Sequence, residues 1–158
     1  MSDPDGEAVA SQRLGFAPDP ENPGWLVRPV VETGAFVDIF GEMRVLVEAP
    51  DKVRLRVYPG PQQRNLVGSI HGGFLLALVD QALFAAPTRL KIAGARDGVT
   101  IDCSTQFLSA GRIGEPLDAV VEILRETGRM VFMRGLLEQG GTRVLAFSGT
   151  IRKATVRT

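Results

Sequence analysis

One carboxylate stands near the middle of an apolar segment, in the stretch NLVGSIHGGFLLALVDQALFAAP over residues 65–87. Residues 73–86 have the length and composition of a helix, and Pro87 marks its expected end. A helix that is apolar on all sides is normally buried, so we expect Asp80 to be at least partly buried. The residues one helical turn from Asp80 are all apolar: Leu76, Ala77, Leu83 and Phe84. A carboxylate in such surroundings is either a catalytic base or nucleophile, or a structural group held by a hydroxyl or a backbone amide.

The expected helix starts at Gly72 and Gly73, two residues that disfavour a helix interior but suit a first turn. Without side chains they leave the backbone N–H groups open, and the positive end of the helix dipole favours a developing oxyanion there. The alternative is that the glycines only let the loop turn. His71 is the only histidine, and either acts as a general base or sets the turn; we favour the structural role.

The distance between Gly72 and Asp80 along the helix bears on whether one chain or two chains form the site. Gly72 and Asp80 are eight residues apart, about 12 Å along one helix. An aspartate side chain does not bridge that distance, so the two do not act on one carbonyl carbon within a single chain. If both are catalytic, a second copy must place its Gly72 beside this Asp80, which predicts a homodimer with two equivalent sites.

The amino-acid composition argues against several classes of function. Eighteen basic and eighteen acidic residues give no net charge, which argues against a dedicated nucleic-acid-binding protein. The single Cys103 excludes an internal disulfide and fits the cytoplasm. The chain has one histidine and one cysteine, so a zinc site would have to be built mostly from carboxylates, and we expect no metal. There is no apolar run long enough for a membrane span and no secretory signal pattern.

The remaining elements must position this helix. Residues 1–30, rich in proline and glycine, are expected to form a flexible or loosely packed arm anchored by Trp25, and residues 31–158 a single domain. Two strands are expected before the helix and four after it, over residues 43–49, 52–59, 99–109, 116–126, 129–139 and 142–153. This order predicts an α+β layer, a curved antiparallel sheet wrapped against one central helix.

These residues together resemble a known family. The pattern N-x-x-G-x-x-H-G-G-x(6)-D fits at the positions Asn65, Gly68, His71, Gly72, Gly73 and Asp80. With GVTIDCSTQFLSAGRIGE downstream, it is similar to the hotdog-fold acyl-CoA thioesterases of the phenylacetate-pathway and human thioesterase-superfamily-member type. The resemblance covers residues 43 to 152 and leaves the first 30 or so residues unmatched.

The resemblance implies roles for individual residues. Asp80 matches the carboxylate that attacks the thioester or activates water, and Gly72 the backbone N–H that polarises the carbonyl. Asn65 matches an amide that places the carbonyl or the water, and Thr100 a hydroxyl near the carboxylate of the same chain. His71 orders the turn, and with Gly73 is counted among the substrate-contacting residues.

The resemblance also implies partners. The substrate is an acyl-CoA, so coenzyme A is part of the substrate and no separate cofactor is expected. The candidates for holding its phosphates are the surface cations Arg129, Arg152 and Lys153. Relatives pair Gly72 and Asn65 of one chain with Asp80 and Thr100 of the next, and assemble as dimers of dimers. Two alternatives stay open: a hotdog-fold hydratase or dehydratase, which would need a catalytic histidine, and a non-catalytic acyl-CoA-binding module.

Overall fold

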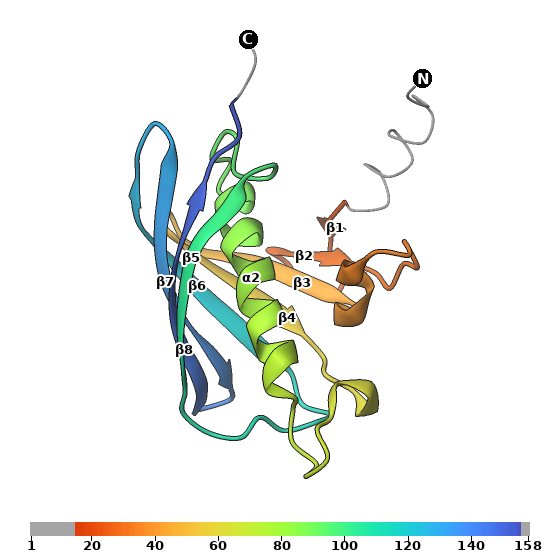
Figure 1. Cartoon of the computed structure of the whole chain (residues 1–158). Coiled ribbons are helices and arrows are strands. Elements are labelled where there is room, and N and C mark those ends of the chain that lie inside the picture. The colour runs from red at the N-terminus through yellow and green to blue at the C-terminus, as the bar shows by residue number, and fades with distance from the viewer. Residues whose placement is uncertain (1–14, 156–158) are drawn as a thin grey trace.

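A computed structural model describes residues 15–155 of the chain. Its centre is one long helix, α2 (Gly72–Arg89), which lies across the inner side of a curved antiparallel sheet (Figure 1). The expected α+β architecture of a sheet wrapped around a central helix is therefore confirmed. No helix among the described residues combines the length and apolar character needed to cross a membrane.

The sheet has eight strands in the order β1-β2-β3-β4-β6-β7-β8-β5. Their bounds are β1 Ala17–Pro18, β2 Trp25–Arg28, β3 Met43–Ala49, β4 Lys52–Val57, β5 Val99–Phe107, β6 Leu117–Glu126, β7 Met130–Gln139 and β8 Thr142–Arg152. Two short 3-10 helices, η1 (Phe36–Phe40) and η2 (Pro61–Gln63), lie in the connections. The chain therefore places β5 at the far edge of the sheet, where, among the described strands, it pairs only with β8.

The six strands expected within residues 43–153 are all present, and their ends move by only a few residues. Alternation explains their orientation: in β4 the residues Val53, Leu55 and Val57 are buried, while the arginines between them face outward. The inward residues of β4, β6, β7 and β8 meet the side of α2 that carries Leu75, Leu78, Ala82 and Ala86. This contact forms the core and fixes the height of α2 over the sheet.

One glycine permits the close approach between α2 and β8. A Cβ atom at Gly149 would lie 2.6 Å from a methyl carbon of Leu83, nearer than real side-chain atoms come. Because Gly149 lacks that atom, Leu83 packs directly on β8. The helix is thereby held next to the edge formed by β8 and β5.

Two expectations need correction. Residues 17–28 of the expected loose arm form β1 and β2, because β2 pairs along its length with β3, and Trp25 lies opposite Leu46. Residues 1–14 of that arm lie outside the described residues, and the division of the chain at residue 30 stays a prediction. The helix also continues past Pro87 to Arg89. The N–H groups of Leu90 and Ile92 donate to the carbonyls of Ala86 and Pro87, so the last turn closes without the missing proline N–H.

Candidate active site

Asp80 and Thr100 lie next to each other, as the family resemblance implied. The Thr100 hydroxyl donates a 2.7 Å hydrogen bond to Asp80 Oδ1, joining the middle of α2 to the first residues of β5. Both residues are exposed in the single chain, so the expectation that Asp80 is at least partly buried was wrong for the isolated molecule. The helix is apolar on all sides, yet its outward side, which includes the 41% exposed Leu76, is left uncovered by residues 15–155.

The start of α2 is organised by His71. Its backbone adopts the extended conformation of an N-cap residue, and its Nδ1 accepts a 2.9 Å hydrogen bond from the Gly73 N–H. Its own N–H donates to the carbonyl of Gln63 at 2.7 Å. The ring nitrogen that would act as a base is therefore occupied in capping the helix, which agrees with the structural role favoured from the sequence.

The two glycines of this turn differ in what they leave free. The Gly73 N–H donates to His71 Nδ1, so this group is not free for a substrate, although Gly73 was counted among the substrate-contacting residues. The Gly72 N–H has no hydrogen-bond acceptor within residues 15–155. The Phe107 ring at the end of β5 lies beside Gly72, 3.4 Å from the place where a Cβ atom would stand. An oxygen that reaches the Gly72 N–H must therefore pass next to Phe107.

Asn65 shapes the loop that leads into α2. Its Oδ1 accepts hydrogen bonds from the N–H groups of Val67 and Ser69, both at 3.0 Å. Its backbone N–H donates to the carbonyl of Ser69 at 2.8 Å, which closes the loop a second time. The side-chain oxygen is thus used within the loop, and the Nδ2 amide is the group of Asn65 that remains for a carbonyl or a water.

The candidate residues form two half-sites within one chain. Asn65 and Gly72 lie on the segment that enters α2, whereas Asp80 and Thr100 lie at the middle of the helix. Gly72 and Asp80 belong to the same continuous helix, so about 12 Å of helix axis separates them. The single chain does not bring the two half-sites together.

The three cations chosen for phosphate binding gather at one end of the sheet. Arg152 lies opposite Val99, the residue before Thr100, and the Lys153 N–H donates to the carbonyl of Arg129. Lys153 Nζ is engaged by Glu126 at 2.7 Å, with only 10% of its side chain exposed. Of the three, Arg129 and Arg152 are the exposed ones that have no ion pair within the described residues.

Cys103 lies on β5, close to this site. Partial burial raises the pKa of its thiol above the ordinary value, and the negative charges of Asp80 and Asp102 add to the effect. A thiol with a raised pKa is a poor nucleophile, so the carboxylate is the better candidate for chemistry here. Within residues 15–155, no three His, Cys, Asp or Glu side chains gather closely enough to hold a metal ion.

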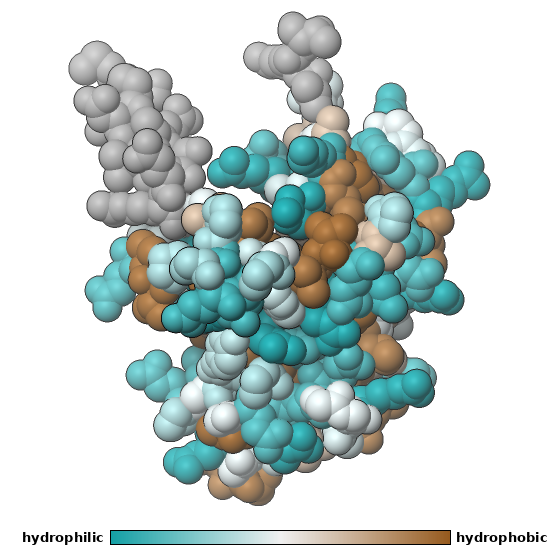
Figure 2. All heavy atoms as spheres, turned by 180° about the vertical axis from the view of Figure 1, so that it is seen from behind, coloured by the Kyte–Doolittle hydropathy of each residue, from teal (hydrophilic) through white to brown (hydrophobic). Residues whose placement is uncertain are grey.

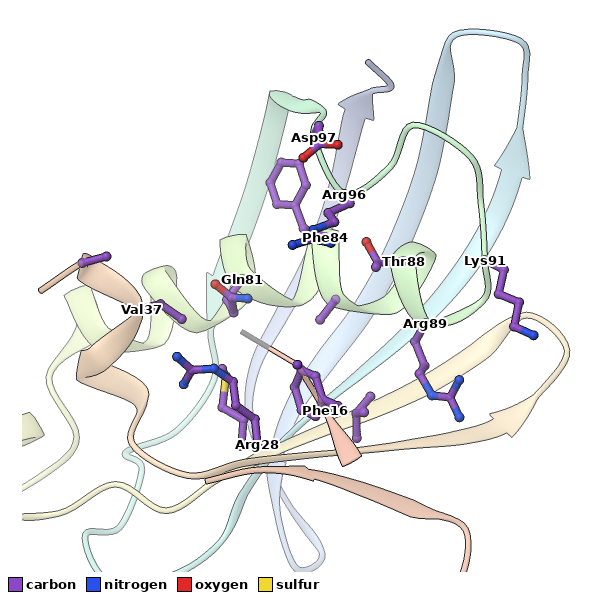
Figure 3. A pocket seen from close by; sticks show the side chains of 15 residues that line it. Phe16, Arg28, Val37, Gln81, Phe84, Thr88, Arg89, Lys91, Arg96 and Asp97 are labelled. Carbon is purple, nitrogen blue, oxygen red and sulfur yellow. The ribbon is translucent and has the colours of Figure 1, made fainter. Parts of the chain in front are cut away.

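Sequence reasoning missed a cavity that lies beside the second half of α2. It has a volume of about 750 Å³ and lies between α2 and the strands β2 and β3 (Figure 3). Gln81 and Phe84 of α2 line it, as do Phe16 and Arg28 from the N-terminal strands. The signal was present in Trp25–Arg28, whose alternation places Arg28 on the same face as the inward Leu26.

The chain is similar in sequence to a known protein family. The family model described as "Thioesterase superfamily" matches residues 67–146, about half of the chain. Human acyl-coenzyme A thioesterase 13 is 22% identical over 107 residues, which cover 68% of this chain and 75% of that protein.

Two solved structures share the fold. The crystal structure of zebra fish thioesterase superfamily member 2 has a TM-score of 0.69 at 23% identity, covering 78% of this chain and 89% of that one. A hypothetical thioesterase protein from Streptococcus pneumoniae, solved with coenzyme A, has a TM-score of 0.67 at 22% identity, covering 77% and 93%. The eight-stranded sheet around one helix is therefore the hotdog arrangement of these proteins.

Proposed function

We propose that this chain, which belongs to the thioesterase superfamily and is a thioester hydrolase, hydrolyses acyl-CoA to free CoA and a carboxylic acid in a site shared by two copies. The observation that carries the proposal is the pairing of Asp80 with Thr100 on the same chain, together with the free Gly72 N–H about 12 Å away. Each half-site lacks what the other has. The structure from Streptococcus pneumoniae that was solved with coenzyme A supports the choice of CoA as the thiol.

The edge strand β5 supports the dimer. It is nine residues long, and its outer edge carries unpaired backbone groups, since within the described part of the chain it pairs with β8 alone. Long apolar edge strands tend to pair with another chain unless they are protected. Large apolar side chains are also exposed on and after this strand and on the adjoining side of α2: Val99, Ile101, Phe107, Leu108 and Leu76. Antiparallel pairing of β5 with a second β5 would cover these side chains and bring the two helices together.

In the proposed reaction the thioester carbonyl oxygen accepts hydrogen bonds from the Gly72 N–H and the Asn65 amide of one copy. Negative charge that develops on this oxygen is favoured at a helix N-terminus. Asp80 of the other copy approaches the carbonyl carbon with Oδ2, while Thr100 holds Oδ1.

Two routes follow from that geometry, and both remain part of the proposal. In the first, Asp80 attacks the carbon, the C–S bond breaks, and CoA leaves as the thiolate, which takes a proton from solvent; water then hydrolyses the resulting anhydride and frees the Asp80 carboxylate. In the second, Asp80 removes a proton from a water molecule, which attacks directly and expels CoA. Arg129 and Arg152 lie near the start of β5 and supply positive charge for the CoA phosphates.

The first test is release of free thiol from a panel of short-chain, long-chain and aryl acyl-CoAs. We expect turnover by the wild type, and its absence above background for every acyl-CoA would contradict the proposal. His71→Ala separates the hydratase alternative, because a hydratase would lose its catalytic base. The capping bond from Gly73 to His71 Nδ1 argues against that role. Binding of acyl-CoA without turnover would instead favour the binding module.

A subunit-mixing experiment tests the shared site directly. Asp80→Asn and Asn65→Ala chains each lack one half-site, so mixed dimers regain one intact site, and activity should return to about a quarter of the wild-type value. A mixture of Asp80→Asn with Thr100→Val is the control, because both changes fall in the same half-site, so no mixed dimer has an intact site and only the residual activity of Thr100→Val is left. Equal activity in the two mixtures would exclude a site built from two chains.

The proposal also covers the oligomeric state of the protein and its location in the cell. We expect a dimer in sedimentation experiments at low protein concentration and a dimer of dimers at higher concentration, as the family resemblance implies. A cytoplasmic location is proposed on the single cysteine, which leaves no internal disulfide for an oxidising compartment to form.

A further inference from the structure

Arg28 is the most unusual charged residue in the described chain. It projects from β2 toward α2, and only 1% of its surface is exposed. All three of its guanidinium nitrogens are buried without a hydrogen-bond partner within residues 15–155. A buried charge that lacks a partner is costly, so such groups normally have a counter-ion or a bound anion.

The nearest acidic residue on η1 does not fill that role. Asp38 accepts hydrogen bonds from the Thr33 hydroxyl at 2.7 Å and from the N–H groups of Thr33 and Gly34 at 2.8 Å. These bonds, chiefly the one from the Thr33 hydroxyl, hold the pKa of Asp38 below its ordinary value, and the charge of Arg28 contributes at longer range. Asp38 is therefore committed to its own loop and forms no ion pair with Arg28.

Arg28 lines the 750 Å³ cavity between α2 and the strands β2 and β3. Figure 3 shows it rising from the sheet below Gln81, with Phe16 further along the cavity and Arg89 beyond it. The walls between these polar groups are largely apolar and include Val37, Met43, Val45, Phe84 and Ala85. Arg89 adds a fourth buried guanidinium nitrogen, its Nε, that has no partner among residues 15–155. The cavity thus has the size of a small-molecule site and combines apolar walls with buried positive charge.

The cavity begins beside the proposed reaction centre, although neither Asp80 nor Thr100 lines it. Gln81 follows Asp80 in the chain and lines the cavity, and Phe84, one helical turn beyond Asp80, lines it as well. The helical residues that line the cavity run from Gln81 to Arg89, about 12 Å along the axis. An acyl chain whose carbonyl lies at Asp80 would extend into this space.

We propose that the cavity binds the acyl chain of the substrate and that Arg28 pairs with a carboxylate at its far end. The preferred substrates are then ω-carboxyacyl thioesters. The inference rests on the proposed function for the thioester part, while the carboxylate site itself depends only on the cavity and Arg28. A carboxylate that accepts from a buried guanidinium forms a charge-assisted, often bidentate, hydrogen bond, which distinguishes it sharply from a methyl end.

The first experiment compares kcat/KM for matched pairs: adipoyl-, suberoyl- and sebacoyl-CoA against hexanoyl-, octanoyl- and decanoyl-CoA. For at least one chain length we expect the ω-carboxy substrate to be favoured by about tenfold or more. In Arg28→Met the ratio for that pair should fall to about one or below. Arg134→Met is the matched control, because Arg134 is an exposed residue of β7 outside the cavity, and it should keep the wild-type ratio.

The second experiment does not need catalysis. Free octanoate carries a carboxylate on an apolar chain and should raise the Tm of the wild type, whereas octanamide should not. Arg28→Met should abolish the effect of octanoate and should itself unfold at a higher temperature than the unliganded wild type, since it removes an unpaired buried charge. A lower Tm for Arg28→Met together with an unchanged substrate ratio would mark Arg28 as a structural residue and overturn the proposal.

The two experiments separate the failure of this inference from that of the proposed function. If no acyl-CoA is hydrolysed but octanoate still stabilises the protein through Arg28, the carboxylate site stands and thioester hydrolysis of acyl-CoA fails. If methyl-ended and ω-carboxy substrates are hydrolysed equally well and octanoate has no effect, the proposed function stands and the carboxylate site is wrong.

Discussion

On the outer face of the sheet, Asp118 of β6 accepts hydrogen bonds from Arg54 at 2.8 Å and from Arg56 at 2.7 and 2.8 Å. On the inner side, next to α2, Asp80 accepts one hydrogen bond from Thr100, and the Arg28 guanidinium donates none within the described residues. Hydrophilic residues predominate on the outer face (Figure 2). Charges there are neutralised by their neighbours, whereas those beside α2 are left with unused bonding capacity.

The outer face shows how this chain treats a structural carboxylate. Arg56 lies directly opposite Asp118 in the pairing of β4 with β6, and Arg54 also reaches Glu138. The hydrogen bond to Asp118 raises the pKa of Arg56 above its ordinary value, although burial opposes this. A carboxylate that serves only the fold is therefore saturated with donors. The open position on Asp80 is the contrast that points to chemistry.

We expect the largest effect on activity from substitution of Asp80. Asp80→Asn keeps the shape of the side chain but loses the base or nucleophile, so kcat should fall by about two to four orders of magnitude. The Tm should hardly change, because Asp80 is exposed in the single chain. Thiol release and thermal unfolding of the same preparation check both statements. Full activity in Asp80→Asn would contradict the proposed role.

Asp118→Asn should show the opposite behaviour. It removes the charge that Arg54 and Arg56 share, while Arg54 keeps Glu48 and Glu138, so the free energy of unfolding should fall by about 2 kcal/mol. Urea denaturation measures this loss. The kcat of the folded fraction should stay at the wild-type value, because Asp118 lies on the side of the sheet turned away from α2. A fall in kcat without loss of stability would break the comparison between the two carboxylates.

Thr100→Val sharpens the comparison on the inner side. The valine preserves the shape and the strand but removes the hydrogen bond to Asp80 Oδ1. Activity should fall by about tenfold, the value of one hydrogen bond to a charged group, and stability should change little. Steady-state kinetics measure the loss, and Thr100→Ser, which keeps the hydroxyl, should retain most of the activity.

His71 gives the smallest effect. His71→Ala removes the acceptor for the Gly73 N–H and should cost about 1 kcal/mol of stability, as loss of a helix N-cap does. His71→Asn supplies a side-chain oxygen in the same role and is the matched control. In urea denaturation, His71→Ala should have a lower free energy of unfolding than both His71→Asn and the wild type. Equal stability of all three would show that the cap contributes nothing.

Much of the site was predictable because it depends on short stretches of chain. Gly72 and Asp80 belong to one helix, so their spacing follows from helical geometry alone. The family pattern added Asn65 and Thr100, and the structure places Thr100 next to Asp80. The expectation that both glycines leave their N–H groups open holds for Gly72 but not for Gly73, because His71, two residues before Gly73, caps the helix through the Gly73 N–H.

The exposure of Asp80 and the position of Arg28 were not predictable in the same way. An apolar helix indicates burial, but nothing in its pattern says whether the covering surface comes from the same chain or from another. Arg28 lies in a proline-rich segment that was expected to be loose, and its strand forms only because β3, further along the chain, offers it an edge.

The sequence by itself determined the elements: one helix with a carboxylate in its middle, six strands that follow it or precede it, and the spacing that separates Gly72 from Asp80. These are consequences of local periodicity, which each segment carries on its own. Only the tertiary structure decided that β5 forms an exposed edge, that Asp80 faces outward, and that Arg28 is buried in a cavity without a partner. Strand order and burial depend on contacts between distant segments, and single-chain patterns do not specify those contacts.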